Sequence, residues 1–381
     1  MQITATTLSG LENTLAAEIQ KIGGENITIL RRAVTFEGNT KLVYRALYEL
    51  RTALRIFLPF YSFKTKHENH LYGKIRDFDW TQKIQLKDTF VIHAFTASKY
   101  LTHSKYLALK IKDAISDQFR SKYDGLRPSI DRHNPIHRLN VHLGRDNLCT
   151  LSWDVSGDPL NRRGYRLQSG KAPLNEVLAA GIILQTNWDK ASDFIDPMCG
   201  SGTFLIEAAM IAANIPPQIN RKQFGIMKNA DFDPALWLRV QEEAQEKISD
   251  FPHQIIGYDK DPSAVNIARS NVQNAGLDAR ISVNKKDFHK VIPTNSNGLL
   301  LMNPPYDERL KTSDILDFYK DIGHSLKHNF SGFDAWIFSG NIRAMRQLGL
   351  RPSSKKILFN GAIECQLAHY ELYKGSKNSG S

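Results

Sequence analysis

The sequence of 381 residues contains only three cysteines and no long apolar stretch. Cys149, Cys199 and Cys365 are too far apart for a disulfide framework or a paired zinc motif, so we expect a reducing cytoplasm and no bound metal. No apolar run approaches the ~20 residues of a membrane-spanning helix, and no basic segment leads into an apolar one at the N-terminus. We therefore expect neither export nor a membrane partner.

Acidic residues are fewer than basic ones, with 39 Asp and Glu against 50 Lys and Arg, a net charge of +11 and an isoelectric point near 9.4. This excess favours a polyanionic partner, because Lys and Arg gain free energy when they release counterions from phosphates. Charge alone leaves open a basic protein that binds no nucleic acid. With 41% hydrophobic residues, the chain is long enough for two or three domains.

Two α+β patterns fill the first 160 residues. Apolar periodicity predicts a first unit over residues 1–66, with helices at 10–22 and 42–50 and strands at 27–30, 33–36 and 55–60. It predicts a second unit over residues 67–160, with a helix at 104–119 and strands at 90–95, 139–143 and 149–153.

Basic side chains gather in the second unit, with tyrosines between them. They are Lys105, Lys110, Lys112, Arg120, Arg127 and Arg132. This mixture suits phosphate contacts with some stacking capacity. An ordinary solvated helix face explains the same pattern equally well.

Strands alternate with helices in a third unit, residues 161–374. A small polar tail, residues 375–381, follows this unit, and we expect it to be mobile. Strands are predicted at 193–195, 255–258, 281–283, 298–302 and 335–338, and helices at 174–186, 205–213, 264–274 and 315–326. This order predicts a doubly wound α/β domain of mostly parallel strands, with ligands at their carboxyl ends. Residues 214–254 form an excursion that reads as an ordered insertion with a helix near 237–248.

A glycine-containing turn follows the first of these strands. Residues 196–203 read DPMCGSGT, and glycine at 200 and 202 would let the backbone approach a nucleotide-like ligand. The Gly-x-Gly spacing alone is weak evidence for a nucleotide-like cofactor. Asp259 ends the next strand and could accept hydrogen bonds from ribose hydroxyls, whereas Asp261 fits an N-cap better. Asp287 and Phe288 follow the third strand and could meet an adenine amine and ring face.

A second motif, NPPY at residues 303–306, ends the fourth strand. The side-chain oxygen of Asn303 and the backbone carbonyl of Pro304 can hold the two hydrogens of an exocyclic base amine, which frees its lone pair. The second proline, Pro305, helps to fix the turn, and Tyr306 can stack on a base swung out of its helix. The two motifs together predict a methyltransferase acting on a base amine, although NPPY alone would suit a rigid turn.

Several segments together resemble the THUMP-domain class I methyltransferases, especially the ribosomal RNA large-subunit guanine-N2 methyltransferases. They are KIKDAI at 110–115, RPS at 127–129, RRGYR at 162–166, APL at 172–174, and the motifs at 196–203 and 303–306. The resemblance covers nearly the whole chain. Two positions depart from it, because Asp307 replaces a glycine that relatives often have and Asn175 stands where a lysine is usual.

The resemblance implies a ferredoxin-like unit, a THUMP unit that binds structured RNA, and a Rossmann-like catalytic domain that uses S-adenosylmethionine. It implies that the motif Asn303, Pro304, Pro305 and Tyr306 holds the target base. It implies that Asp196, Gly200, Gly202, Asp259 and Asp287 line the cofactor pocket. The turns that contain these residues add Cys199, Thr203 and Phe288 as candidates, with Cys199 acting only as a small residue. It also implies that Arg163 and Arg166 cover the cofactor or touch RNA.

The expected activity is methylation of a guanine N2 in large-subunit (23S) ribosomal RNA. The same NPPY motif also suits methylation of adenine N6 in RNA or DNA. The choice of guanine therefore comes from the resemblance. An RNA-binding assembly factor that has lost turnover is the alternative of a different class, and the intact residues 303–306 argue against it.

Overall fold

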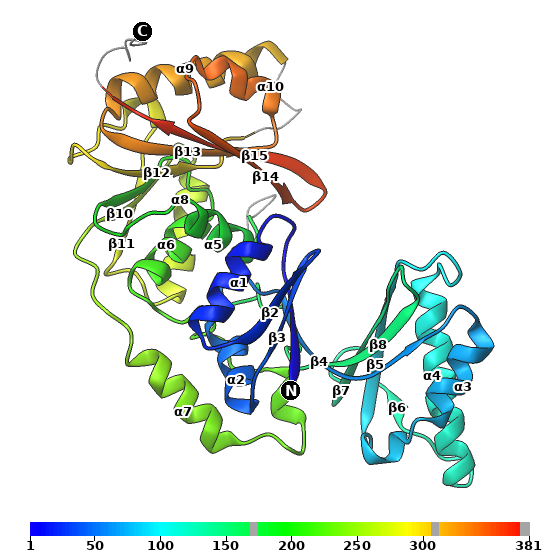
Figure 1. The fold of residues 1–381 in the computed structure, drawn as a ribbon. Coiled ribbons are helices and arrows are strands. Elements are labelled where there is room, and N and C mark those ends of the chain that lie inside the picture. Colours follow the sequence, from blue (N-terminus) through cyan, green and yellow to red (C-terminus); the bar gives the residue numbers. More distant parts are fainter. Residues whose placement is uncertain (168–173, 306–311, 374–381) are drawn as a thin grey trace.

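The computed structural model describes residues 1–167, 174–305 and 312–373, and Figure 1 shows them as two sheets with their helices. One sheet of eight strands lies in the N-terminal half, and one of seven lies in the C-terminal half. The predicted tail, 375–381, lies outside the described residues. Among the described helices, none has both the length and the apolar character that crossing a bilayer requires.

The N-terminal sheet has the strand order β2-β3-β1-β4-β8-β7-β5-β6. Its strands are β1 (Gln2–Thr6), β2 (Glu25–Leu30), β3 (Ala33–Glu37), β4 (Arg55–Lys64), β5 (Thr89–Thr96), β6 (Ser129–Ile130), β7 (His137–Leu143) and β8 (Leu148–Asp154). Its helices are α1 (Glu12–Lys21), α2 (Thr40–Glu49), α3 (Glu68–Asp77) and α4 (Ser104–Lys122), with a short helical turn at Trp80–Gln82. The sequence patterns located most of these elements but missed β1, β6 and α3.

Strand β4 joins the two N-terminal units into one sheet. Its first residues pair with β1, and it then pairs with β8 along almost its whole length, with a bulge after Pro59. The sequence predicted that this strand ends at residue 60, but pairing with β8 extends it to Lys64. Ile56 of β4 packs in the core with α1 and α2, and Leu151 of β8 packs with α3 and α4.

The C-terminal sheet has the order β11-β10-β9-β12-β13-β15-β14, in which the first five strands are parallel. Its strands are β9 (Asp193–Asp196), β10 (Ile255–Asp259), β11 (Ile281–Lys285), β12 (Gly298–Met302), β13 (Phe333–Ser339), β14 (Ser354–Asn360) and β15 (Ile363–Glu371). The predicted doubly wound α/β pattern is confirmed. The antiparallel hairpin β14–β15 was not predicted.

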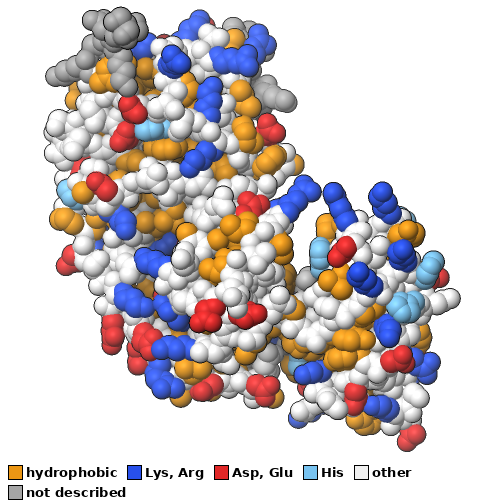
Figure 2. All heavy atoms as spheres, in the orientation of Figure 1, with side chains coloured by type: hydrophobic (Ala, Val, Ile, Leu, Met, Phe, Trp, Pro, Cys, Tyr) orange, Lys and Arg blue, Asp and Glu red, His pale blue; other side chains and the backbone are white. Residues whose placement is uncertain are grey.

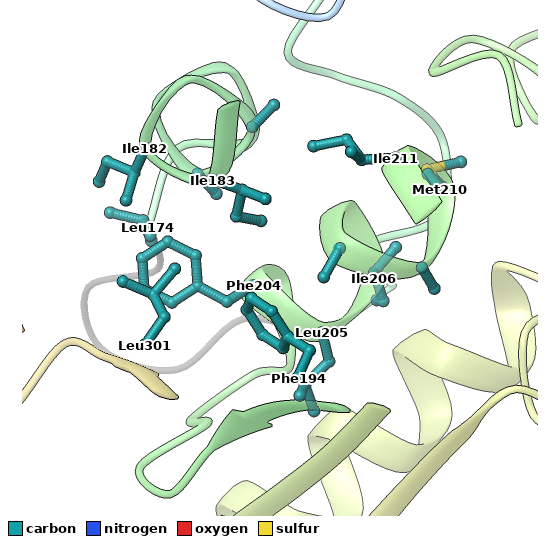
Figure 3. Packing of buried hydrophobic residues seen from close by; sticks show 14 of the residues in the cluster. Leu174, Ile182, Ile183, Phe194, Phe204, Leu205, Ile206, Met210, Ile211 and Leu301 are labelled. Carbon is teal, nitrogen blue, oxygen red and sulfur yellow. The ribbon is translucent and has the colours of Figure 1, made fainter. Parts of the chain in front are cut away.

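Helices cover both faces of this sheet. They are α5 (Glu176–Gln185), α6 (Thr203–Ala212), α8 (Pro262–Asn274), α9 (Thr312–Asn329) and α10 (Ile342–Met345), with short turns at Phe288–Lys290 and Arg346–Leu348. Figure 3 shows Ile183 of α5, Phe204 of α6 and Phe194 of β9 pointing into one apolar space. Because α5 and α6 are apolar on nearly every side, both can only be buried helices. Their packing fixes the turn between β9 and α6.

The excursion at 214–254 has a structural purpose that the sequence did not reveal. Its helix α7 (Pro234–Gln245), which follows a short turn at Gly225–Lys228, packs against α2 of the first unit. The Trp237 ring meets Tyr44 at 5.4 Å and Tyr48 at 6.0 Å between centroids. The excursion therefore completes the core of the N-terminal unit and attaches it to the C-terminal domain.

Candidate active site

A cavity of about 1300 Å³ lies at the carboxyl ends of β9, β10 and β12. Strands of a parallel sheet bring the turns that follow them to the same edge, which is where such folds bind ligands. The lining therefore brings together the two sequence motifs, which are about a hundred residues apart. The predicted residues that line it are Asp196, Cys199, Gly200, Thr203, Asp259, Asp287, Phe288, Asn303, Pro304 and Pro305.

The two glycines of the turn have different roles. Gly200 has a φ of +53°, and a Cβ added there would meet no atom within 4 Å, so its backbone is open to a ligand. Gly202 has a φ of +80° and directly precedes α6, and a Cβ there would come within 3.3 Å of the Ala268 Cβ on α8. Gly202 therefore allows α6 and α8 to pack closely, and its part in the approach to a cofactor stays a prediction.

Two carboxylates stand beside this turn. Asp259 accepts hydrogen bonds from the backbone N–H groups of Gly200 at 3.0 Å and Asp261 at 2.9 Å. Asp196 is buried and accepts from the Met198 N–H at 3.1 Å. Burial raises the pKa of Asp196 well above its ordinary value, and the nearby Asp259 raises it further. Such a pair of carboxyl groups suits a positively charged ligand, because a cation favours their ionised form.

The remaining acidic residues of the turns act partly as helix caps. Asp261 accepts from the Ser263 N–H at 2.8 Å and caps α8, which confirms the predicted N-cap. Asp287 accepts from the His289 N–H at 3.1 Å, so one of its carboxylate oxygens is already used. Phe288 lines the cavity with its ring stacked on Phe330 at 5.8 Å.

Cys199 is a buried thiol. Its Cβ and Sγ lie 3.2 Å from the position that a Cβ on Gly257 would take. Burial raises the pKa of Cys199 well above its ordinary value, and Asp196 and Asp259 add to this effect. The thiol is therefore protonated near neutral pH, in agreement with its predicted role as a small residue and not a nucleophile.

Asn303 presents the most informative polar atom of the cavity. Its side-chain Oδ1 is buried and has no hydrogen-bond partner within the described residues. A buried acceptor without a partner costs about 1–3 kcal/mol, so such atoms require an explanation. Pro304 and Pro305 follow it in the cavity wall. Tyr306 and Asp307 lie outside the described residues.

The β14–β15 hairpin supplies a wall that the sequence did not indicate. Its turn places Asn360, Gly361 and Ile363 in the cavity lining, although they are about sixty residues beyond NPPY. Only the antiparallel pairing of β15 with β13 brings them there. Nothing in the local sequence pattern signals that long-range pairing.

Arg163 is a correction to the predicted RNA contacts. Its side chain is 0% exposed, and its Nε lies 2.8 Å from the Glu207 Oε1 in an internal ion pair. Its Nη2 also donates to the Arg51 carbonyl at 2.8 Å, and Tyr165 donates to the same Glu207 oxygen at 2.9 Å. A guanidinium enclosed in this way cannot reach RNA or the cofactor, so Arg163 is a structural residue.

Arg166 is also engaged inside the protein. Its Nε forms an ion pair with Glu176 at 2.9 Å, and its Nη2 donates to the Thr203 hydroxyl at 3.0 Å. Asn271 donates to the Ser201 carbonyl at 3.0 Å and so supports the same turn. Arg166 therefore supports the cavity turn from behind, and its guanidinium is not presented to RNA.

The other predicted RNA contacts lie on or near α4. Lys105, Arg120, Arg127 and Arg132 are exposed. Arg120 pairs with Asp117 at 3.0 Å, Lys112 pairs with Asp113 at 2.6 Å, and the Lys110 ammonium lies 5.5 Å from the Tyr72 ring centre. The carboxylates of Asp113 and Asp117 reduce the positive charge that α4 presents to a polyanion.

Asn175, the departure from the related sequences, is a helix cap. It accepts hydrogen bonds from the backbone N–H groups of Val177 at 2.9 Å and Leu178 at 3.3 Å and begins α5. Asparagine is among the best N-cap residues. The substitution is therefore compatible with the fold around the site.

The fold and the cavity define a methyltransferase domain that follows an N-terminal α+β half. Three family models match in order: RlmL ferredoxin-like domain over residues 2–57, THUMP domain over 65–154, and the RMKL-like methyltransferase domain over 163–369. The chain belongs to the RMKL-like methyltransferase family.

Named relatives agree with this family. The ribosomal RNA large subunit methyltransferase K/L of Syntrophotalea carbinolica is 36% identical over 380 residues, which is 97% of this chain and 53% of that protein. The chain spans about half the length of the curated relatives that it matches.

Solved structures share the whole architecture. SMU.472, described as a methyltransferase complexed with SAH, is 27% identical with a TM-score of 0.88 over 98% of this chain and 99% of its own. A structure from Listeria monocytogenes described as a predicted N6-adenine-specific DNA methylase is 28% identical with a TM-score of 0.87, over 97% of this chain and 96% of its own.

Proposed function

We propose that this chain is an S-adenosylmethionine-dependent RNA methyltransferase that modifies the exocyclic N2 amine of a guanine in large-subunit (23S) ribosomal RNA. The observation that carries the proposal is the buried Oδ1 of Asn303, which has no hydrogen-bond partner among the described residues and lies in the same cavity as the glycine turn and its carboxylates. Such an acceptor is suited to an N–H donor from a ligand.

The residues of the cavity fit the cofactor. Gly200 offers open backbone, while Asp196 and Asp259 provide the negative charge that an ammonium and a sulfonium complement. We assign the ribose hydroxyls to Asp259 and the adenine amine to Asp287, whose carboxylates keep free lone pairs besides those already used. When bound, S-adenosylmethionine supplies the methyl group on a sulfonium.

Asn303 and Pro304 orient the accepting amine. Their two oxygens would accept its two hydrogens, which would hold the nitrogen lone pair free of the ring. Bound S-adenosylmethionine would supply the methyl group and leave as its neutral thioether product, and the proton lost from the amine would pass to solvent. Positioning can contribute about 7–11 kcal/mol in such a bimolecular step. Burial of the Asn303 Oδ1 limits competition from water for the same acceptor.

The N-terminal half supports RNA as the substrate. It contains the THUMP match and many of the basic side chains of a chain with net charge +11. The printed name of the relatives, ribosomal RNA large subunit methyltransferase K/L, supports large-subunit RNA. We place the protein in the cytoplasm, where this RNA is made.

Adenine N6 is the second candidate target, because its amine offers the same two hydrogens to Asn303 and Pro304. The Listeria structure described as an N6-adenine-specific methylase shares the fold over nearly the whole chain. An RNA-binding assembly factor without turnover is the third candidate.

The test incubates the protein with isotopically labelled S-adenosylmethionine and large-subunit RNA from cells that lack the gene. Mass spectrometry of the nucleosides is expected to show label in N2-methylguanosine. Label in N6-methyladenosine would change the base and keep the mechanism. Binding of both partners without any label would favour the assembly factor.

A further inference from the structure

The THUMP half of the N-terminal sheet has an open face opposite α3 and α4. Successive residues of a strand point to opposite faces, and Val141 and Leu151 point to the core that these helices cover. Residues at alternate positions form a row across four strands on the other face. The register of the sheet pairs Phe95 with His142, His142 with Thr150, and Thr150 with Ser62.

Phe95 contributes an exposed phenyl ring to this row. It is 58% exposed, and its ring is parallel to that of His142, with 3° between the planes and 5.7 Å between the centres. Strand β6 pairs with β5 only at Thr89 and Phe90, so Phe95 lies near an edge of the sheet. A single exposed ring is common on protein surfaces, so the residues around Phe95 decide whether this face can bind a ligand.

His142 is suited to support a flat ligand in its neutral form. Burial of its ring lowers the pKa of His142 below the ordinary value, and Asp146 opposes that change. A neutral imidazole beside a phenyl ring extends one apolar surface. Beyond it, Ser62 Oγ lies 3.2 Å from Thr150 Oγ1, and both hydroxyls can exchange hydrogen bonds with the polar edge of a ligand.

Basic side chains surround the row at this end of the sheet. Lys64 lies two residues beyond Ser62 on the same face, opposite Leu148. Lys99 and Arg145 belong to two loops that a hydrogen bond from Ser98 Oγ to Asn147 Oδ1 joins at 2.8 Å. Asp146 is the acidic exception in these loops. In Figure 2, several Lys and Arg side chains gather on the upper part of the lobe that contains β5, β7 and β8.

We propose that Phe95, His142, Thr150, Ser62 and Lys64, here called the sheet platform, bind an unpaired nucleotide of the RNA substrate by stacking its base on Phe95. Flat exposed rings with nearby cations match a base and its phosphates, whereas a helix or an apolar peptide would need a wider apolar surface. The sheet platform deepens the proposed function and rests on RNA being the substrate. It faces away from α4, where the sequence placed the RNA contacts.

The test compares RNA binding by the full chain and its variants, using a large-subunit RNA fragment and fluorescence anisotropy at several salt concentrations. Phe95→Ala is expected to weaken binding about ten-fold, the lower range for loss of one stacked base, with an unchanged salt slope. Phe95→Trp is expected to keep the affinity. Lys64→Ala is expected to reduce the salt slope by about one.

The matched control is Leu109→Ala, which removes an exposed apolar side chain from α4 on the other side of the lobe. It is expected to leave RNA binding unchanged. A second measurement crosslinks the wild-type protein to RNA that contains photoreactive 5-iodouridine, and we expect crosslinked peptides that include Phe95 or His142.

Two negative results separate the two proposals. Normal RNA binding by Phe95→Ala, or crosslinks confined to α4, would overturn the sheet platform while leaving the proposed function intact. Failure of the wild-type chain to bind any large-subunit RNA would overturn both. Cofactor binding by every variant, measured by calorimetry, is expected to match wild type, because the sheet platform lies outside the cofactor cavity.

Discussion

The two sheets of the molecule present their functional groups in different ways. Helices cover both faces of the C-terminal sheet, so its polar groups converge at one edge, in a single cavity at the ends of β9, β10 and β12. Helices α1 to α4 pack on one face of the N-terminal sheet, and polar and aromatic side chains are spread over its opposite face. An enclosed site suits chemistry on one base, and an extended face suits contact with a large polyanion.

The largest expected effect falls on the enclosed site. Asn303→Ala removes an acceptor that the target amine needs, and we expect turnover to fall by about 10²–10³-fold, the range known for loss of one transition-state hydrogen bond. Cofactor affinity is expected to stay unchanged, as measured by calorimetry. Asn284→Ala on exposed β11 is the control. Normal turnover by Asn303→Ala would remove Asn303 from the mechanism.

The second effect concerns the buried ion pair between Arg163 and Glu207 inside the C-terminal domain. Glu207→Ala leaves the buried Arg163 without its carboxylate, and an uncompensated buried charge costs about 3–5 kcal/mol of unfolding free energy. Urea denaturation measures the loss, and Glu242→Ala on the exposed side of α7 is the control. Equal stability of the two variants would show that the buried ion pair contributes little to the stability of the fold.

The sequence predicted the enclosed site better than the extended face. The motifs at 196–203 and 303–306 each follow an apolar strand, and the ends of parallel strands meet at one edge, so their convergence follows from local patterns. The Asp261 cap was predicted for the same reason, because caps depend on neighbouring residues.

Long-range packing decided what the sequence missed. Arg163 appeared in a basic run typical of a surface, but its partner Glu207 lies forty-four positions away in an otherwise apolar helix. The β14–β15 wall depends on pairing with β13, and α7 finds its place against α2 through Trp237. The row of Phe95 and His142 depends on a sheet register that no local periodicity defines.

A third prediction uses the raised pKa of Asp196 in the enclosed site. A cationic cofactor favours the carboxylate, so affinity is expected to fall as the pH drops through this raised pKa, at a pH above the ordinary carboxyl range. Stability of the cofactor-free protein is expected to rise over the same interval, because the folded state holds the proton more tightly than the unfolded state.

Calorimetry and thermal unfolding at a series of pH values measure these opposite trends. Asp196→Asn is expected to flatten both, because the amide does not titrate in this range. Parallel changes of affinity and stability with pH in the wild type would contradict the assignment of Asp196 to the cation.

The smallest effect is expected on the helical side of the N-terminal half. The double variant Lys110→Ala and Lys112→Ala removes two cations from α4, but Asp113 already partly neutralises Lys112, and Lys110 lies against Tyr72. We expect RNA affinity to fall only about two- to five-fold and the salt slope to decrease by about one, less than two free cations would give. Binding measured across salt concentrations tests this. A loss of RNA affinity larger than that of Phe95→Ala would place the main RNA contact on α4 instead of the open face. An unchanged salt slope would show that α4 is an ordinary solvated helix.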